Sequence, residues 1–321
     1  MKNLIFISNY RNQLEKETLN QTNKKYIELL KINFKNTKGI LVTINLTANE
    51  LMTKKGIKEA KEIIKIVISE YANKTDTFLF AGSTKRIFKG NKGQAILKKI
   101  APNCLFTIGD NGTSILLIES IKKTIKENNL DKDSKILIVG ATGILGLETL
   151  KYLYNKKFNE ISIMTSNISN SIELSKTYSG INVISDYNNI KNLDLIITCT
   201  HNEYSLLNNK IISSIKHKNH KLSIVDVAQP SNVSPTIQLQ SEKEINYTTA
   251  GNGYSLDIIY DKENVITNKD IGFGDNEIFG CFSEAFVLTN ENIKKGNFFS
   301  VNETNISFIL DLFKKYDINI K

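Results

Sequence analysis

Short apolar runs alternate with helically spaced apolar stripes over the first part of the chain. The runs Gly39–Leu46, Thr77–Ala81 and Cys104–Ile108 are typical of buried strands. After the first run, apolar residues recur at steps of three and four up to about Tyr71, which predicts a helix with one apolar face. The stripe consists of Ile57, Ala60, Ile63, Ile64 and Val67.

The helix after the first run carries a start signal. Thr47 is followed three residues later by Glu50, the spacing of a capping box, in which each side chain accepts a hydrogen bond from the other residue's backbone N–H. Gln94–Ile100 predicts a second helix, and the loop Gly109–Thr113 opens a third over Ser114–Glu127. Strands that alternate with helices form a mainly parallel sheet.

A second unit begins after the polar stretch Asn128–Asp131. Lys135–Val139 is typical of a strand buried on both faces, and a glycine-containing loop and a helix to about Tyr154 follow it. Three further strands and one helix continue the alternation: Ile161–Met164, Leu193–Thr198, Ser205–Ile215 (the helix) and Leu222–Val227. This order predicts a Rossmann-type, doubly wound parallel sheet.

These patterns divide the chain into three parts within an α/β fold class. Residues 1–130 are expected to form a smaller N-terminal α/β domain for substrate binding and catalysis, and residues 131–275 the Rossmann domain. Residues 276–321 have helical patterns at both ends, with a break near Lys295–Asn297. We expect this C-terminal segment to pack back on the first domain.

The strongest local signal is the loop after Lys135–Val139, whose glycines have the spacing G-x-x-G-x-x-G, a variant of the dinucleotide-binding motif. Gly140 allows a tight turn, Gly143 lets backbone amides approach a pyrophosphate, and Gly146 lets the helix lie close to the sheet. The helix N-terminus then offers N–H groups and a positive dipole to the phosphates. The predicted cofactor-binding loop is Gly140, Ala141, Thr142, Gly143, Ile144, Leu145 and Gly146.

The residues after the next strand select the cofactor. An acidic residue there would bind the ribose hydroxyls of NAD and repel the extra phosphate of NADP, but this chain has Thr165, Ser166 and Asn167. Hydroxyl and amide groups can bind a phosphate, so the sequence favours NADPH over NADH, with Ser166 and Asn167 as contacts. Thr200 and Asp226 follow later strands and are expected to line the cofactor crevice.

Composition narrows the class of protein. The chain has 321 residues, of which 40% are hydrophobic, and a net charge of +9. A bias towards Lys, Asn and Ile explains the charge; attraction to an acidic partner such as acyl-carrier protein is the alternative. The chain has no basic–aromatic array of the kind that binds nucleic acid. It also has no apolar run of about 18 residues, the length that a membrane span needs. Three scattered cysteines without zinc spacing predict no metal site and indicate a reducing cytoplasm.

Cys281 is the candidate nucleophile. It opens a predicted helix, whose dipole would lower the pKa of the thiol, and a thiolate can attack a thioester carbonyl. A buried small residue at a loop–helix junction explains the same position, and Glu284 is explained by the favourable place of an acid in a first helical turn. His201 follows a strand and could donate a proton to an oxyanion; a surface histidine explains it equally well.

Six blocks of the chain occur in a characteristic order. They are Asn45–Met52, Phe78–Ser83, Thr107–Thr113, Gly140–Gly146, Asp226–Pro230 and Gly280–Ala285. In these blocks the chain resembles the long-chain acyl-carrier-protein reductases and the wider shikimate-dehydrogenase-like group. The acylated cysteine of those reductases falls on Cys281.

This resemblance implies reduction of an acyl thioester to an aldehyde. Cys281 would take the acyl group from acyl-carrier protein or coenzyme A, and NADPH would deliver a hydride to the enzyme-bound thioester. The resemblance also implies that Asp110, Asn111 and Thr113 contact the substrate. Asp110 stands where the family has asparagine, so an acid replaces an amide there.

Two other functions stay open. A dehydrogenase of hydroxyl or amino groups, of the shikimate or amino-acid type, needs no cysteine and commonly uses a lysine–aspartate pair, for which Lys54, Lys55 and Asp110 are candidates. A non-catalytic NAD(P)-binding sensor would bind the cofactor without reacting with acyl thioesters. Replacement of Cys281 separates the acyl reductase, which needs this thiol, from the dehydrogenase, which tolerates its loss.

Overall fold

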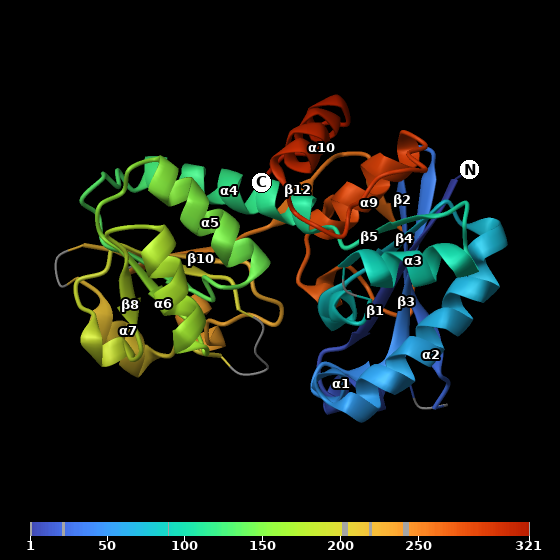
Figure 1. Cartoon of the computed structure of the whole chain (residues 1–321), viewed down its shortest axis with the longest axis horizontal. Helices are drawn as coiled ribbons and strands as arrows, with labels where there is room; N and C mark the ends of the chain where they lie inside the picture. Colours follow the sequence, from blue (N-terminus) through green and yellow to red (C-terminus); the bar gives the residue numbers. More distant parts are fainter. Residues whose placement is uncertain are drawn as a thin grey trace. The chain divides into compact units, whose positions relative to one another are not determined.

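The computed structural model describes residues 2–20, 23–88, 90–200, 205–217, 220–239 and 244–320 (Figure 1). The chain forms two compact units, one of Met1–Ile115 with Asn252–Lys321 and the other of Leu116–Gly251. The sequence pattern places the boundaries elsewhere, at 130/131 and 275/276. The difference arises because helix α4 (Asp110–Glu127) is continuous across the first change of unit, and because β13 (Ile258–Tyr260) pairs with a strand of the first unit.

A six-stranded sheet with the order β13-β2-β3-β1-β4-β5 forms the centre of the first unit. The strands β3, β1, β4 and β5 are parallel to one another, whereas β2 is antiparallel to both β3 and β13. The remaining bounds are β1 Lys2–Tyr10, β2 Tyr26–Phe34, β3 Thr37–Thr47, β4 Thr77–Phe80 and β5 Leu105–Thr107. The mainly parallel sheet and its three predicted strands are confirmed.

The sequence pattern does not predict β1, which lies in the middle of this sheet. Its side chains alternate between the two faces. Ile5 and Ile7 are buried in the core that α2 (Lys54–Tyr71) covers, whereas the Phe6 ring stacks on Phe282 of α9 (Gly280–Asn290). The apolar run Leu4–Ile7 is only four residues long, and periodicity alone cannot distinguish such a run from a buried helix segment. Unlike Lys135–Val139, it is not followed by a glycine loop that would mark it as a strand.

Helices cover both faces of the sheet. α2 packs on β3 through its predicted apolar stripe, and α9 packs against β1, β3 and β4 and is buried almost all round (Figure 1). The other helical elements of the unit are α1 Gln13–Leu19, η1 Glu50–Met52, η2 Ala72–Lys74, η3 Gly82–Arg86, α3 Gly90–Ile100, η5 Lys269–Ile271 and α10 Glu303–Lys315. The C-terminal segment is therefore helical at both ends, as predicted.

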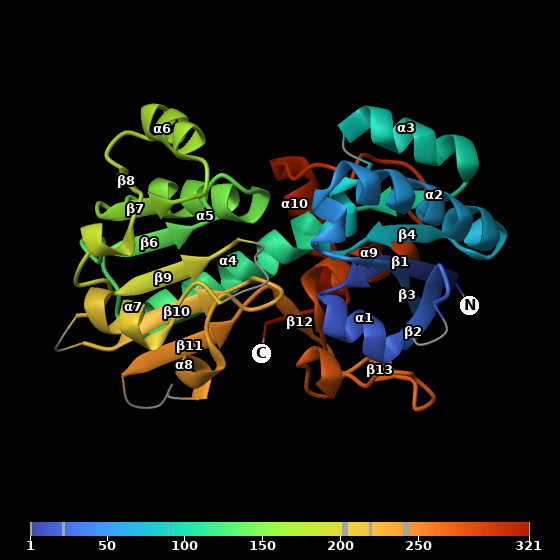
Figure 2. The same ribbon diagram turned by 90° about the horizontal axis from the view of Figure 1, so that it is seen from below.

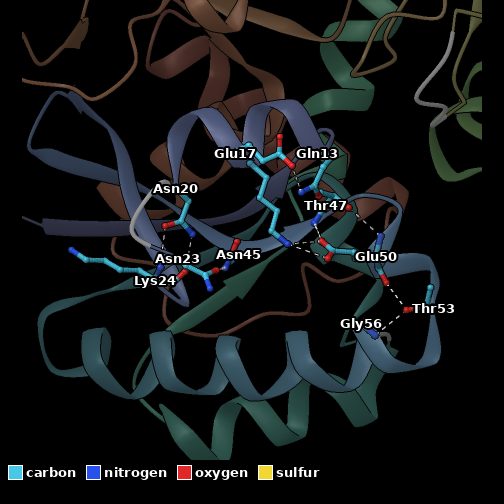
Figure 3. Close-up of polar contacts among 11 residues, drawn as sticks. Gln13, Glu17, Asn20, Asn23, Lys24, Asn45, Thr47, Glu50, Thr53 and Gly56 are labelled. Atoms are coloured by element: carbon cyan, nitrogen blue, oxygen red, sulfur yellow. Dashed lines mark hydrogen bonds and ion pairs between the residues drawn. The ribbon is translucent and has the colours of Figure 1, made fainter.

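A reciprocal pair of hydrogen bonds joins Thr47 and Glu50 after β3 (Figure 3). The Glu50 N–H donates to Thr47 Oγ1 at 3.2 Å, and the Thr47 N–H donates to Glu50 Oε2 at 2.6 Å. The predicted capping box is present, but it closes the short turn η1 rather than α2. α2 has its own N-cap in Thr53, whose Oγ1 accepts the Gly56 N–H at 2.9 Å.

The second unit contains a six-stranded parallel sheet with the order β11-β10-β9-β6-β7-β8 (Figure 2). From β6 the chain runs outward through β7 and β8 and returns to β9 on the other side of β6. This reversal is the doubly wound Rossmann order, which binds dinucleotides where the strand order changes. The predicted fold class is confirmed.

The strands of this sheet are β6 Ile136–Val139, β7 Ile161–Met164, β8 Asn182–Ile184, β9 Leu195–Thr198, β10 Leu222–Asp226 and β11 Ile245–Thr249. Its helical elements are α5 Ile144–Asn155, α6 Ile168–Thr177, η4 Tyr187–Asn189, α7 Asn209–Ile215 and α8 Pro235–Leu239. Apolar side chains from both faces form its core. Over the whole described part of the chain, no helix is long and apolar enough to cross a membrane.

We expect Thr53→Ala to weaken the start of α2. The substitution leaves the Gly56 N–H without its acceptor, which costs about 1 kcal/mol in comparable helix caps. Native-state hydrogen exchange of the α2 amides measures this loss, and Thr53→Ser, which keeps the oxygen, is the matched control. Equal protection of the α2 amides in both variants would contradict the assignment of Thr53 as the cap.

Candidate functional site

Cys281 lies at the start of α9, where the chain leaves a short two-stranded sheet. In this sheet β14 (Glu277–Phe279) is antiparallel to β12 (Asn252–Tyr254), and Phe279 is the N-cap of α9. Phe282 anchors the helix start to the sheet, because its ring lies 3.9 Å from that of Phe6, centroid to centroid. Cys281 itself keeps partial exposure. The predicted helix start at this cysteine is confirmed.

A turn that follows β5 lies directly against Cys281. Gly109 has a φ of +70°, a conformation that favours glycine. A Cβ there would lie 2.3 Å from Cys281 Cβ and 2.5 Å from its Cα. At Gly112, a Cβ would lie 2.6 Å from the carbonyl oxygen of Gly280. Only glycine permits this approach, so two blocks that are far apart in sequence form one site.

Lys85 and Asp110 form an ion pair in this site. Asp110 is the first residue of α4 and is 4% exposed, and Lys85 lies in η3, after β4. Lys85 Nζ donates a hydrogen bond to Asp110 Oδ1. Burial opposes the charge of Lys85, but the negative charge of Asp110 helps to raise the pKa of Lys85 above its ordinary value. At neutral pH Lys85 is therefore a cation whose charge acts on Cys281.

Glu284 is fully buried, and its carboxylate binds the same turn. Thr107 Oγ1 donates to Oε1 at 2.6 Å, and the Gly112 N–H donates to Oε2 at 2.7 Å. First-turn N–H groups such as that of Gly112 have no partner within their own helix, so Glu284 of α9 caps α4. Burial raises the pKa of Glu284 to about 7, although the bonds from Thr107 and Gly112 oppose this rise.

Burial also raises the pKa of the Cys281 thiol, to about 11. Lys85 lowers this pKa, Asp110 and Glu284 raise it, and the hydrogen bond from the Phe282 N–H makes the smallest contribution by lowering it. The expectation of a thiol acidified by the helix start is therefore wrong, because desolvation outweighs the helix terminus. The thiol is protonated at neutral pH, so its reaction as a nucleophile requires a proton acceptor.

The predicted substrate residues lie together at the start of α4. Thr113 Oγ1 donates to the Gly109 carbonyl oxygen at 3.0 Å and so stabilises the turn. Asn111 is fully buried, and its amide makes no well-aligned hydrogen bond within the described part of the chain. It nevertheless lies close enough to Glu284 to lower the pKa of that carboxyl group slightly. Of these three predicted substrate residues, Asp110 is the one that forms an ion pair beside Cys281, and its partner is Lys85.

The sequence pattern assigns no role in the site to two of its charged residues, Lys85 and Glu284. Lys54 and Lys55 are exposed at the start of α2, and Asp110 pairs with Lys85 instead. The available signal for Lys85 was its place in a loop directly after a buried strand. For Glu284 it was an acid in a predicted helix that contains no other charged residue. His201, the candidate proton donor, lies outside the described residues.

In the second unit the glycine loop joins β6 to α5. Gly140 has a φ of +90°, and a Cβ there would lie 2.9 Å from the carbonyl carbon of Cys199. At Gly146 a Cβ would lie 2.2 Å from the Gly140 carbonyl oxygen, so the helix lies directly on the turn. Gly143 is the N-cap of α5 and provides no side-chain cap. This geometry fits a pyrophosphate at the helix N-terminus.

The residues after β7 suit a polar ligand. Ser166 and Asn167 are both exposed at the carboxyl end of the strand, where the ribose of a dinucleotide lies in this fold. Asn167 Oδ1 also accepts the Asn170 N–H at 3.2 Å and so caps α6. The contacts of Ser166 and Asn167 with a 2′-phosphate stay a prediction.

Asp226, at the end of β10, is 1% exposed and shapes the loop that follows it. Its donors include Thr198 Oγ1 at 2.5 Å, the Ala228 N–H at 3.0 Å, Ser231 Oγ at 2.5 Å and the Asn232 N–H at 3.1 Å. Burial raises the pKa of Asp226 against these bonds. Thr200 lies next to the glycine loop, since a Cβ at Gly140 would lie 3.0 Å from Thr200 Cβ.

Comparisons with known proteins match the nucleotide-binding part of the chain. The family model described as shikimate/quinate 5-dehydrogenase matches residues 121–248, which lie within the second unit. A glutamyl-tRNA reductase of Thermosipho melanesiensis is 27% identical over 119 residues, which are 36% of this chain and 31% of that protein. A glutamyl-tRNA reductase of Clostridium novyi is 31% identical over 117 residues, 36% of this chain and 28% of that protein.

The chain thus spans about a third of the length of these relatives, 31% and 28%. Among solved structures, L-tryptophan dehydrogenase of Nostoc punctiforme aligns with a TM-score of 0.47 at 10% identity, over 98% of this chain and 89% of that one. The second unit is similar to the domain of an NAD(P)-dependent dehydrogenase group, and NADPH is consistent with that similarity. The family match includes none of the residues around Cys281.

We expect Lys85→Met to raise the pKa of Cys281, because the substitution removes the cation that lowers it. The pH midpoint of Cys281 alkylation by iodoacetamide, followed on its own peptide by mass spectrometry, should rise by roughly 1 unit, the smaller end of the effect of a nearby opposite charge. Lys55→Met, at an exposed position, is the control and should leave the midpoint unchanged. An unchanged midpoint in Lys85→Met would show that the cation does not act on the thiol.

We expect Gly143→Ala to weaken NADPH binding without unfolding the second unit. Its backbone suits alanine, with φ −79° and ψ 168°, and a Cβ there would come no closer to another residue than 3.3 Å, to the Gly140 carbonyl oxygen. The added methyl group would stand where the pyrophosphate must approach. Quenching of NADPH fluorescence measures affinity, and the Tm reports the fold. Native affinity at a native Tm would place the pyrophosphate elsewhere.

Proposed function

We propose that this protein uses NADPH to reduce an acyl thioester to an aldehyde through a covalent intermediate on Cys281. The observation that carries the proposal is the grouping of this thiol with the ion pair between the half-buried Lys85 and the buried Asp110. A nucleophile, a cation and a carboxylate in one site are the groups that acyl transfer requires.

The first step is transfer of the acyl group to the protein. The sulfur of Cys281 attacks the carbonyl carbon, a new S–C bond forms, and the C–S bond to the carrier breaks. The proton of the Cys281 thiol passes by way of a nearby carboxylate, Asp110 or Glu284, to the leaving thiolate. The Lys85 ammonium group stabilises the negative charge that develops on the carbonyl oxygen.

The second step restores the thiol. NADPH, when it is bound at the glycine loop, supplies the two electrons for the acyl carbon as a hydride. The bond between that carbon and Cys281 then breaks, its electron pair stays on sulfur, and one proton regenerates the thiol. The products are an aldehyde, the free protein and the oxidised cofactor.

The relatives support an activated acyl group as the substrate. Their name, glutamyl-tRNA reductase, describes reduction of an acyl group that tRNA carries. An acyl ester of tRNA and an acyl thioester are both activated for nucleophilic attack. The resemblance of the Gly280–Ala285 block to acyl-carrier-protein reductases favours the thioester, and an acyl-tRNA belongs among the substrates to be tested.

A second candidate is a dehydrogenase of a hydroxyl or amino group. The Lys85–Asp110 ion pair favours it, because a lysine held by an aspartate can exchange a proton with a substrate as a hydride is transferred. The family match to shikimate/quinate 5-dehydrogenase is compatible with this candidate. It assigns no chemical role to Cys281 and no covalent intermediate.

Intact-protein mass spectrometry separates the two candidates. The protein is incubated without NADPH with acyl-carrier-protein thioesters, acyl-coenzyme A thioesters and an aminoacyl-tRNA. We expect one acyl adduct on the native protein, none on Cys281→Ala, and an undiminished adduct on Cys199→Ala, because Cys199 is a cysteine of the other unit. Aldehyde should appear when NADPH is added.

Absence of an adduct across the panel, with NADPH still bound, would contradict covalent catalysis and support the dehydrogenase. An adduct that persists in Cys281→Ala would assign the nucleophile to another residue. An adduct only from the tRNA ester would keep the mechanism and replace the thioester by a different substrate class.

A further inference from the structure

The proposed mechanism uses Glu284 at most as a passing proton acceptor, yet its place in the fold is costly. Its side chain is completely buried in α9, a helix whose other residues from Phe282 to Thr289 are also buried. Burial of a carboxylate is unfavourable unless hydrogen bonds compensate for the lost water. An apolar residue would satisfy the packing of α9, so the carboxylate needs an explanation of its own.

Both carboxylate oxygens bind the turn that carries Asp110. Oε2 accepts the Gly112 N–H directly, two residues after Asp110. Oε1 accepts Thr107 Oγ1, and the same hydroxyl accepts the Gly109 N–H at 2.9 Å, one residue before Asp110. The two bonds therefore flank Asp110 and fix the backbone on either side of it.

We propose that Glu284 is a positioning residue, which caps α4 from α9 and thereby holds Asp110 and its partner Lys85 where their charges act on Cys281. The turn lies close to α9 on both sides of Asp110. Gly109 touches Cys281, and a Cβ at Gly112 would lie 2.8 Å from Glu284 Cβ. Loss of the Glu284 carboxylate would remove the hydrogen bonds from α9 on both sides of Asp110.

Glu284 is coupled electrostatically to three charged or titratable groups in the described part of the chain. Asp110 at the start of α4 raises its pKa, and Glu284 in turn acts on Lys85 of η3 and on Cys281 of α9. The negative charge of Glu284 raises the pKa of Cys281, while its hydrogen bonds hold Lys85, through Asp110, near enough to lower it. Charge and positioning therefore have opposite effects on the thiol, and substitutions can separate them.

The test measures how strongly Lys85 acts on Cys281. The coupling is defined as the change that Lys85→Met causes in the pH midpoint of Cys281 alkylation by iodoacetamide. It is measured in four backgrounds: the native residue, Glu284→Gln, Glu284→Ala and Thr107→Val. Circular dichroism and NADPH binding show that each variant is folded.

In Glu284→Gln the amide oxygen still accepts the Gly112 N–H, so the coupling should stay at roughly 1 pH unit. The midpoint itself should fall, because a negative charge is lost beside the thiol. In Glu284→Ala the turn is released, and the coupling should vanish. Thr107→Val removes one of the two bonds and should give an intermediate coupling, which keeps the test decisive if Glu284→Ala does not fold.

Native coupling in Glu284→Ala or Thr107→Val would overturn the proposal, as would a vanished coupling in Glu284→Gln. The inference rests on the proposed function only in taking Cys281 as the reacting group. Alkylation needs neither acyl substrate nor cofactor, so the two can fail separately. Loss of coupling without any acyl adduct in the native protein would support the positioning role and contradict the thioester reductase.

Discussion

The site in the first unit depends on one close backbone contact. The turn at Gly109 lies against the first turn of α9 so closely that the Cβ of any other residue would meet Cys281 itself. This contact brings together a strand end near residue 107 and a helix start near residue 280. The positions of the charged residues depend on this contact. Asp110 continues the turn, Lys85 pairs with Asp110, and Glu284, three residues after Cys281 in α9, binds the turn.

Desolvation decides the resting state of this site. The thiol of Cys281 and the carboxyl of Glu284 both have a raised pKa, because the cost of charging a buried group exceeds the help of the helix terminus and of the hydrogen bonds. Lys85 stays charged because Asp110 compensates for its burial. The site therefore holds a cation beside a protonated nucleophile, and thiolate forms only when a proton is transferred.

Much of the fold followed from local patterns, and much of the site did not. The apolar run at Ile136–Val139, the glycine spacing and the stripe on α2 are signals that the local sequence carries. β1 lacked such a signal, because its apolar run Leu4–Ile7 is only four residues long and no glycine loop follows it. The boundaries of the units lacked one because α4 continues through the first of them. Cys281 was identified through its block and helix start. Its partners Lys85 and Glu284 come from elements that only the folded chain brings together.

The central claim is that Cys281 carries the acyl group during reduction. A single-turnover measurement tests it most directly: the acylated protein is freed of unbound thioester, mixed with NADPH, and followed by nicotinamide absorbance, aldehyde yield and the mass of the Cys281 peptide. The account predicts one NADPH oxidised and one aldehyde formed for each acyl group lost from Cys281. The claim would be contradicted if the acyl group stayed on Cys281 and NADPH were consumed only after free thioester was added.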